Sequence, residues 1–501
     1  MRYATFLGQL STALALIATS ACAGALTEPQ PADGSIRLSP EDDVASIVAA
    51  APEGAVFRLV DGNFRSWSVV PKNGQAFIAE GSAAVLDGSM PVDAWINVDG
   101  RWVAKIPPEG WNAGRARPGS PALSREDLFI DEQLLLQVAS LDDLKPGRWY
   151  RDGTTAYIVD DPKGRLVELS VVPHAFAGEA ENVVLKGLIV RQYASPAQSG
   201  AIEGAKGERW TLIDVSAAHN HSRGLSLGPS MAVEGGAFVW NGQLGIGGRG
   251  HDVTVKHAEI AHNNFAGYDH WWEAGGMKIT KSDNLKFIAN YVHHNDGPGL
   301  WLDWDNRYAL IEGNLIAANR GLGLQYEASR EGRVKDNIVA RNDQSGYDDG
   351  FWGAEILVQN SSGIEVTGNV VVVEYNAGIG VTQQDRGGGD YGDHLAIDTV
   401  VTDNTVIYLN KNGKSGAWGD FREPELYQGT RFDRNRYIIP SGSEANRFWE
   451  QAGRHLDWEE VRSMGWETNG ALEAVDEPTR FEPNYLEWYR TNPRGRQVNE
   501  E

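Results

Sequence analysis

The pattern that predicts the fold is clearest in residues 299–342, GLWLDWDNRYALIEGNLIAANRGLGLQYEASREGRVKDNIVARN. This stretch contains two successive units, and each begins with a glycine, Gly299 or Gly323, followed by alternating apolar residues. Within each unit, short apolar runs are separated by Gly, Asn and Asp, which favour turns. The runs are too short for helices, so they predict two or three short strands in each unit.

The same unit recurs to either side of this stretch, at intervals of 21 to 31 residues. Ala354 takes the place of one opening glycine, and the other openings are Gly200, Gly224, Gly245, Gly276 and Gly378. Asparagines recur in two further registers: Asn290, Asn314, Asn337, Asn369 and Asn404 in one, and Asn220, Asn263, Asn295, Asn319 and Asn342 in the other. Repetition at such a period is typical of solenoids, and stacked asparagines can hydrogen-bond along a ladder.

These patterns predict an all-β fold, a right-handed parallel β-helix in which each coil supplies three parallel sheets. Leucine-rich repeats would need leucines at fixed offsets, and a β-propeller would need units of about 40 residues with antiparallel hairpins. We expect five segments: a signal peptide (1–25), an N-terminal cap with the first coils (26–90), a β-rich insertion (91–175), the β-helix catalytic domain (176–415) and a C-terminal cap (416–501).

The N-terminus predicts export from the cytoplasm. Arg2 precedes an apolar run and then small residues, as in secretory signal peptides, so the protein is expected to be secreted or periplasmic. The small residues before Cys22 leave a lipid anchor at that cysteine open, and a single cysteine excludes an intramolecular disulfide. No apolar run of 18 residues follows residue 25, so no transmembrane segment is expected.

The charge balance argues against a nucleic-acid partner. Asp and Glu number 68 against 45 Lys and Arg, which gives a formal net charge of −23. Such a chain repels phosphate backbones. No dinucleotide-binding or phosphate-loop pattern occurs, so no organic cofactor is expected.

Two carboxyl groups are the best catalytic candidates. Asp303 lies four residues after Gly299, and Glu327 lies four residues after Gly323. Side chains alternate along a strand and neighbouring strands lie about 4.8 Å apart, so these carboxyls are expected on one face, roughly 5 Å apart. Retaining glycosidases use two carboxyls about 5–5.5 Å apart, and such closeness raises one pKa.

Several side chains around this pair are expected to bind a polysaccharide or oligosaccharide, since aromatic faces stack on sugar rings. They are Glu273, Trp301, Trp304, Asp305, Trp272, Lys278 and Gln384. Two other interpretations of the carboxyls stay open. They could bind a structural or catalytic calcium ion together with Asp305 and Glu273, or they could be ordinary surface residues.

The sequence GLWLDWDN (299–306), followed by the glutamate of LQYEAS (324–329), resembles the active-site pair of β-helix β-xylosidases. The resemblance covers residues 298–332 and implies that Asp303 is the nucleophile and Glu327 the acid/base. Residues 176–415 resemble the pectin-lyase-like superfamily more generally. The expected function is therefore a secreted, retaining glycoside hydrolase acting on a plant or microbial polysaccharide or oligosaccharide.

Two other functions remain open. A polysaccharide lyase or epimerase needs a base and a group that neutralises a uronate carboxyl. Lys281 in TKSDN resembles the lysine base of β-helix alginate and chondroitin lyases, but those enzymes have an arginine where this chain has Asp303. A non-catalytic carbohydrate-binding β-helix is the second alternative, and it would not need two stacked carboxylates.

Overall fold

The computed structural model describes residues 34–110, 112, 114–118, 120, 124–343, 351–419, 428–443, 449–451 and 453–492. The expected signal peptide and Cys22 lie outside the described residues. The chain from Ile36 onward forms one compact unit. No helix in the described part is long and apolar enough to cross a membrane.

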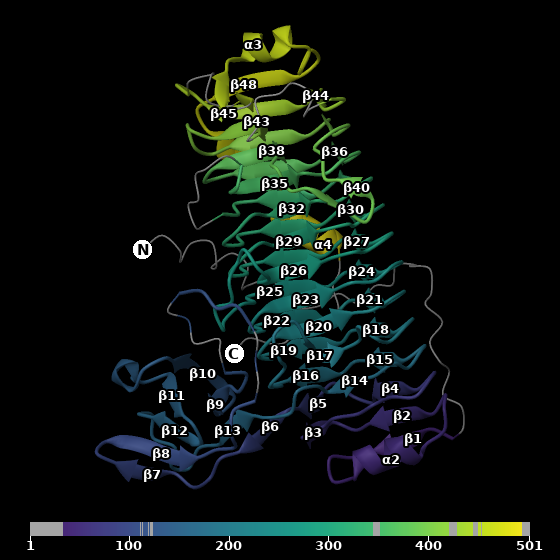
Figure 1. Cartoon of the computed structure of the whole chain (residues 1–501), viewed down its shortest axis with the longest axis vertical. Helices are drawn as coiled ribbons and strands as arrows, with labels where there is room; N and C mark the ends of the chain where they lie inside the picture. The colour runs from purple at the N-terminus through teal and green to yellow at the C-terminus, as the bar shows by residue number, and fades with distance from the viewer. Residues whose placement is uncertain are drawn as a thin grey trace. The chain divides into compact units, whose positions relative to one another are not determined.

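Three long sheets, here called A, B and C, are built from short strands, which follow one another in that order in each coil between residues 184 and 451 (Figure 1). Sheet A contains β1 (Ile36–Leu38), β2 (Val56–Leu59), β4 (Ala76–Ala79), β15 (Val184–Lys186), β18 (Thr211–Ile213), β21 (Ala232–Glu234), β24 (Thr254–Lys256), β27 (Lys286–Ile288), β30 (Leu310–Glu312), β33 (Arg333–Lys335), β36 (Glu365–Thr367), β41 (Val400–Thr402) and β44 (Arg431–Asp433).

Sheet B contains β3 (Gly62–Arg65), β5 (Ala84–Asp87), β16 (Ile189–Arg191), β19 (Ser216–Ala218), β22 (Ala237–Val239), β25 (Glu259–Ala261), β28 (Tyr291–His293), β31 (Leu315–Ala317), β34 (Ile338–Ala340), β37 (Val370–Val373), β42 (Thr405–Tyr408), β45 (Arg436–Pro440) and β48 (Ala471–Val475). Sheet C contains β14 (Phe176–Ala177), β17 (Gly200–Glu203), β20 (Arg223–Leu227), β23 (Leu244–Gly248), β26 (Gly275–Ile279), β29 (Leu300–Asp303), β32 (Leu324–Glu327), β35 (Ala354–Gln359), β38 (Ala377–Gln383), β43 (Lys414–Gly419), β46 (Trp449–Gln451) and β47 (Arg454–Leu456).

Neighbouring strands within each sheet are parallel, apart from the terminal pair β46–β47. Crossovers between parallel strands of one sheet are right-handed. The fold is therefore the predicted right-handed parallel β-helix. Alternate residues of each strand point inward, as Leu300 and Leu302 do in β29, and they build one continuous apolar core.

Two buried asparagine ladders run along the coils, and each ends on a carboxyl group. In one ladder Asn295 donates from Nδ2 to Asn319 at 2.8 Å, and Asn319 donates in turn to Asn342 at 2.9 Å. Asn342 then donates to Glu355 at 2.6 Å. The second ladder passes from Asn290 through Asn314, Asn337, Asn369, Asn404 and Asn435 to Glu467. The predicted asparagine stacking is confirmed.

The ladder also explains why glycine opens so many units. A Cβ atom on Gly299 would lie 2.7 Å from Asn319 Nδ2, and one on Gly323 would lie 2.7 Å from Asn342 Nδ2. Real Cβ atoms essentially never approach a neighbour so closely. Glycine and asparagine therefore recur together because the ladder needs both.

An accessory lobe interrupts one coil between β5 of sheet B and β14 of sheet C. Its eight-stranded sheet contains β6 (Ser89–Pro91), β7 (Ile96–Val98), β8 (Arg101–Lys105), β9 (Leu128–Ile130), β10 (Gln133–Val138), β11 (Arg148–Asp152), β12 (Thr155–Ile158) and β13 (Val167–Ser170), with the short helix η1 (Leu141–Asp143). The lobe has its own apolar core around Trp149. The lobe also contacts the coils, for example where Arg117 Nη2 donates a hydrogen bond to Asp296 Oδ2 at 2.6 Å.

The ends of the solenoid are covered differently. Helix α2 (Val44–Ala50), capped by Asp43, lies between β1 and β2 in the chain and at the N-terminal end of the coils (Figure 1). The coils continue past residue 415, where the repeat was expected to end, because β44, β45 and β48 extend sheets A and B. Helix α3 (Trp458–Ser463) follows the last sheet C strands, and a C-terminal strap, residues 476–492, carries η4 (Pro478–Phe481) and α4 (Tyr485–Thr491). The strap returns along sheet B, where Trp488 donates to the Gly313 carbonyl at 3.0 Å.

Candidate active site

Asp303 and Glu327 occupy paired positions on adjacent strands of sheet C. The register joins Asp303 in β29 to Glu327 in β32, as the sequence spacing predicts. Leu302 and Tyr326 point into the core and are fully buried. Because side chains alternate along a strand, the two carboxyls therefore lie on the outer face of sheet C, on strands about 4.8 Å apart.

Glu327 is almost completely buried, with 2 % of its surface exposed. Its Oε2 accepts hydrogen bonds from Trp301 Nε1 at 2.8 Å and Gln325 Nε2 at 3.0 Å, and its Oε1 lies 2.6 Å from Arg386 Nη2. Burial, helped by the neighbouring charge of Asp303, raises the pKa of Glu327 to about 7, although Arg386 acts in the opposite direction. Glu327 can therefore hold a proton near neutral pH.

Asp303 has a different environment. Its Oδ2 lies 2.9 Å from Lys278 Nζ, while its Oδ1 is buried and has no hydrogen-bond partner among the described residues. Lys278 is itself fixed, because Nζ donates to the Trp272 carbonyl at 2.7 Å and lies 3.4 Å from the centre of the Trp301 ring. One oxygen of Asp303 is thus held by Lys278, and the other makes no hydrogen bond with the described residues.

The two carboxyls therefore have different capacities. One is a buried acid that exchanges its proton near neutrality, and the other is a carboxylate with an uncommitted oxygen. When the environments of two carboxyl groups give them different pKa values, one of them can act as the acid and the other as the nucleophile.

Asp305 and Trp304 follow Asp303 but do not continue its face. Trp304 is half-exposed and has a positive φ of 61°. Asp305 is buried, accepts from the Asp390 amide at 3.0 Å, and contacts His394 Nε2 at 3.2 Å. Its carboxylate, expected to bind substrate, is thus occupied by the loop that contains β39 (Gly388–Gly389) and β40 (Gly392–Asp393). The same loop carries Arg386, so Asp305 helps to position the guanidinium that contacts Glu327.

The remaining predicted binding residues are largely engaged with the protein. Glu273 is buried and bonded to Arg223 and Gln198. Trp272 contributes its carbonyl to Lys278, and its ring lies 5.9 Å from the Arg115 guanidinium.

Gln384 belongs to a chain of amides that ends at Glu327. Gln359 donates to Gln384 Oε1 at 2.8 Å, and Gln325 donates both to Gln359 at 2.9 Å and to Glu327. This chain fixes the orientation of the Glu327 carboxyl across neighbouring coils.

The other residues considered for calcium binding and for lyase chemistry have partners of their own. Glu273 and Asp305 are committed to Arg223 and to the Asp390 loop, so the four carboxyls do not form one cluster. Lys281 Nζ contacts Asp390 Oδ2 at 2.7 Å, and this hydrogen bond raises the pKa of Lys281 above its usual range. His293 and His294 contact each other and Glu259 rather than a catalytic carboxyl.

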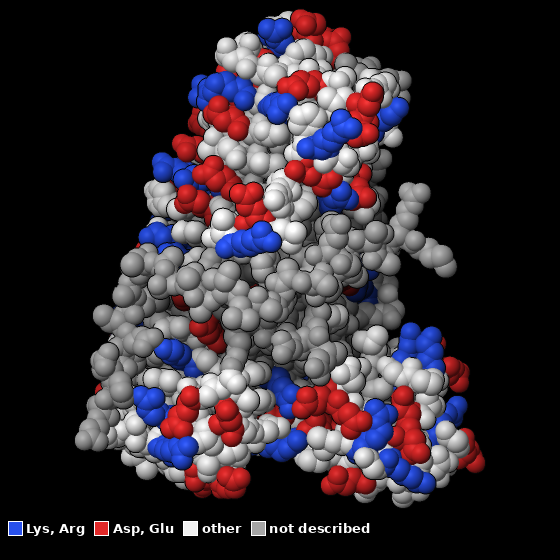
Figure 2. Space-filling view, turned by 180° about the vertical axis from the view of Figure 1, so that it is seen from behind, with Lys and Arg blue, Asp and Glu red and all other residues white. Residues whose placement is uncertain are grey.

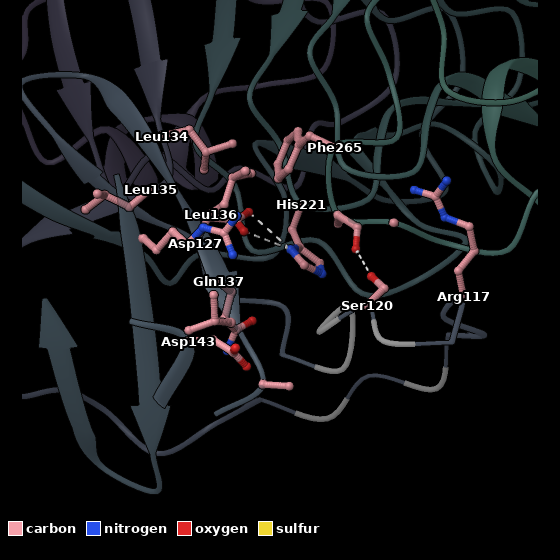
Figure 3. Close-up of a pocket in the computed structure, with 15 residues that line it drawn as sticks. Arg117, Ser120, Asp127, Leu134, Leu135, Leu136, Gln137, Asp143, His221 and Phe265 are labelled. Atoms are coloured by element: carbon pink, nitrogen blue, oxygen red, sulfur yellow. Dashed lines mark hydrogen bonds and ion pairs between the residues drawn. The ribbon is translucent and has the colours of Figure 1, made fainter. Parts of the chain in front are cut away.

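A cavity of about 410 Å³ lies where the lobe meets the coils, away from the catalytic candidates (Figure 3). His221 faces Asp127 of the lobe across a 3.1 Å contact, and Leu134, Leu135 and Phe265 supply apolar walls. Neither Asp303 nor Glu327 lines it. On the face opposite to that of Figure 1, acidic and basic side chains are intermingled over the described residues (Figure 2). On that described surface, the net negative charge is therefore not gathered in one patch.

Arg386 contacts Glu327 but was not among the binding residues expected from the sequence. It lies 59 positions from Glu327 in the chain, in a glycine-rich loop outside the repeat. The available signal was the sequence RGGGD, whose glycines allow the loop to turn back over the preceding coils.

Comparisons with known proteins agree on the fold. The sequence model of the family described as "Right handed beta helix region" matches residues 200–371. XylC, solved in complex with xylose, is 16 % identical, with a TM-score of 0.63 over 88 % of this chain and 83 % of that chain. The A-module of the mannuronan C-5 epimerase AlgE4 from Azotobacter vinelandii is 11 % identical, with a TM-score of 0.42 over 76 % of this chain and 92 % of that chain. No curated protein matches this chain by sequence.

Proposed function

We propose that this protein is a retaining glycoside hydrolase that acts on a polysaccharide or oligosaccharide. The observation that carries the proposal is the register pairing of Asp303 with a buried Glu327 whose pKa is raised to about 7. Strands about 4.8 Å apart bring two carboxyls close to the separation of about 5–5.5 Å that retaining chemistry uses.

Asp303 is the nucleophile in this mechanism. Its carboxylate attacks the anomeric carbon, and the bond from that carbon to the leaving oxygen breaks as Glu327 gives the oxygen its proton. A glycosyl ester on Asp303 results. Glu327, now ionised, takes a proton from water, and the water oxygen attacks the anomeric carbon and releases the Asp303 carboxylate.

The surrounding residues support each role. Lys278, whose ammonium lies over the Trp301 ring, holds one oxygen of Asp303 in place, and Trp301 Nε1, Gln325 and Arg386 orient Glu327. Trp304 and Trp271 are both about half exposed and offer ring faces for sugar stacking. Xylosides are the first substrates to test, because XylC was solved with xylose and the Asp303 region resembles β-xylosidases.

A lyase or epimerase is less well supported. Its candidate base, Lys281, is paired with Asp390 and holds its proton more tightly than an ordinary lysine. A base for proton abstraction works best with a pKa near the operating pH. A non-catalytic binding protein would not need Asp303 and Glu327 to have different environments.

The test is incubation of the secreted protein with neutral and uronate-containing substrates, xylosides included. Reducing ends and unsaturated-uronate absorbance are followed together for the wild type, Asp303→Asn and Asp99→Asn. Asp99 is an exposed turn residue of the lobe, so it serves as a matched control. We expect reducing ends without absorbance, lost only in Asp303→Asn. Rising absorbance would support the lyase, and binding without turnover in the wild type would support the non-catalytic alternative.

Export to the periplasm or the medium belongs to the same proposal. We expect removal of residues 1–25, or lipid attachment at Cys22. The mass and N-terminal sequence of the mature protein distinguish the two.

A further inference from the structure

Three histidines from two adjacent coils meet at the turn between sheets B and C. His262 follows β25, His293 ends β28, and His294 comes next in the chain. Each offers a ring nitrogen within 4.8 Å of those offered by the other two. No other cluster of three or more His, Cys, Asp or Glu ligand atoms at this spacing occurs among the residues that the structure describes.

A carboxylate fixes the proton of the central histidine. His293 Nε2 lies 2.9 Å from Glu259 Oε1, so the ring donates from Nε2 and keeps the lone pair on Nδ1. That Nδ1 faces His294 Nδ1 at 2.8 Å. A carboxylate behind a histidine is the usual arrangement around metal-bound imidazoles.

Stacking contacts hold the three rings in place before any ligand arrives. His262 is stacked on Trp240 at 4.5 Å with an interplanar angle of 6°. His294 is stacked on His262 at 5.3 Å, and Tyr291 covers His293 at 3.8 Å. The cluster also grades from buried His293 through half-buried His262 to exposed His294, so an ion can reach it from solvent.

We propose that His262, His293 and His294 form a binding site for a divalent transition-metal ion, zinc first, with Glu259 orienting His293 from behind. Neutral imidazoles suit zinc and its neighbours rather than calcium or magnesium, which prefer oxygen ligands. Three histidine ligands leave a fourth tetrahedral position for water. The ion would join the turns of two neighbouring coils. This site is independent of the proposed hydrolase, whose carboxyls lie on the outer face of sheet C.

The experiment is titration of the full chain, stripped with EDTA, with ZnCl₂ alone by calorimetry, with Co²⁺ absorption as a second readout. The variants are His294→Ala, His262→Ala and Glu259→Gln. His251→Ala is the matched control, because His251 is exposed and lies outside the cluster. Melting curves establish that each variant is folded, and His294→Gln or His262→Gln replaces the alanine variant at the same position if that variant is not.

We expect one zinc ion per chain in the wild type and in His251→Ala, with a Co²⁺ spectrum of low coordination number. Binding should be lost in His294→Ala and His262→Ala. Glu259→Gln should keep the stoichiometry and weaken affinity by about 10–100-fold. The absence of saturable binding in the wild type, or unchanged binding in His294→Ala, would overturn the proposal. Unchanged affinity in Glu259→Gln would overturn the role given to that carboxylate.

Discussion

Glu327 lies opposite Asp303 where strands β29 and β32 pair, and each carboxyl contacts a different cationic side chain. Lys278 contacts Asp303 at 2.9 Å, and Arg386 contacts Glu327 at 2.6 Å. Like charges opposite one another destabilise a sheet unless they are compensated. Two cations, together with a proton that Glu327 retains near neutrality, allow the pair to exist and give its members different chemistry.

Replacement of Glu327 by alanine should affect turnover according to the leaving group. A general acid contributes about 10²–10⁴-fold where the leaving oxygen needs a proton. Glu327→Ala should therefore lose that factor on natural glycosides and much less on aryl glycosides with acidic phenols. Steady-state rates on a series of leaving groups measure this, with exposed Glu365→Gln as control. An equal loss across the series would argue against an acid role.

The pH profile should fall on the alkaline side near neutrality. The acid must carry its proton, and the pKa of Glu327 is raised to about 7, so kcat/KM should decline as pH rises through about 7. The charge of Arg386 lowers this pKa. Arg386→Gln should therefore move the decline to higher pH, as measured by kcat/KM from pH 4 to 9. A decline at the same pH in both proteins would show that another group controls it.

The asparagine ladder should be sensitive to single substitutions. Asn319 accepts from Asn295 and donates to Asn342 and to the Val292 carbonyl, all buried. Asn319→Ala strands these partners, and each buried unsatisfied group costs about 1–3 kcal/mol. Chemical denaturation should show a clear loss of unfolding free energy. Exposed Asn97→Ala should change stability by less than about 0.5 kcal/mol. Equal effects of the two substitutions would contradict a structural role for the ladder.

Glu355, at the end of one ladder, should make stability depend on pH. Burial raises its pKa to about 8 in the folded chain, above the ordinary glutamate value of 4.5. Between these values the folded state holds a proton that the unfolded state has released, so its contribution is full below about pH 4.5 and is lost as pH rises through about 8. Glu355→Gln should reduce the fall of unfolding free energy over this range by at most about 1.4 kcal/mol per pH unit. Parallel pH curves for both proteins would contradict this assignment.

The sequence predicts the fold and the catalytic pair because both depend on a repeat. Gly299, Asn319 and their equivalents recur once per coil, and the strand period places Asp303 and Glu327 on one face. Contacts made by loops outside the repeat could not be predicted in this way. Asp305 shares the spacing of its neighbours, but its carboxylate turns to the Asp390 loop.

The histidine cluster could be predicted from the sequence only in part. The sheet B register pairs His293 with Ala261 of the preceding coil, which places His262 level with His294. Their ring contacts with Trp240, Tyr291 and Glu259 become apparent only in three dimensions. The continuation of the coils past residue 415 was missed for a related reason. Among the described residues past 415, Asn435 is the one that continues the asparagine ladder.

Covalent trapping tests most directly whether Asp303 is the nucleophile of a retaining glycoside hydrolase. The protein is treated with the 2-deoxy-2-fluoro derivative of the glycoside that it cleaves, and the intact mass and proteolytic fragments are then measured. We expect a mass increase equal to one fluorosugar. The added mass should lie on the peptide that contains Asp303 and should be absent in Asp303→Asn. Turnover with inversion at the anomeric carbon, formation of an unsaturated product, or an adduct on another residue would contradict this expectation.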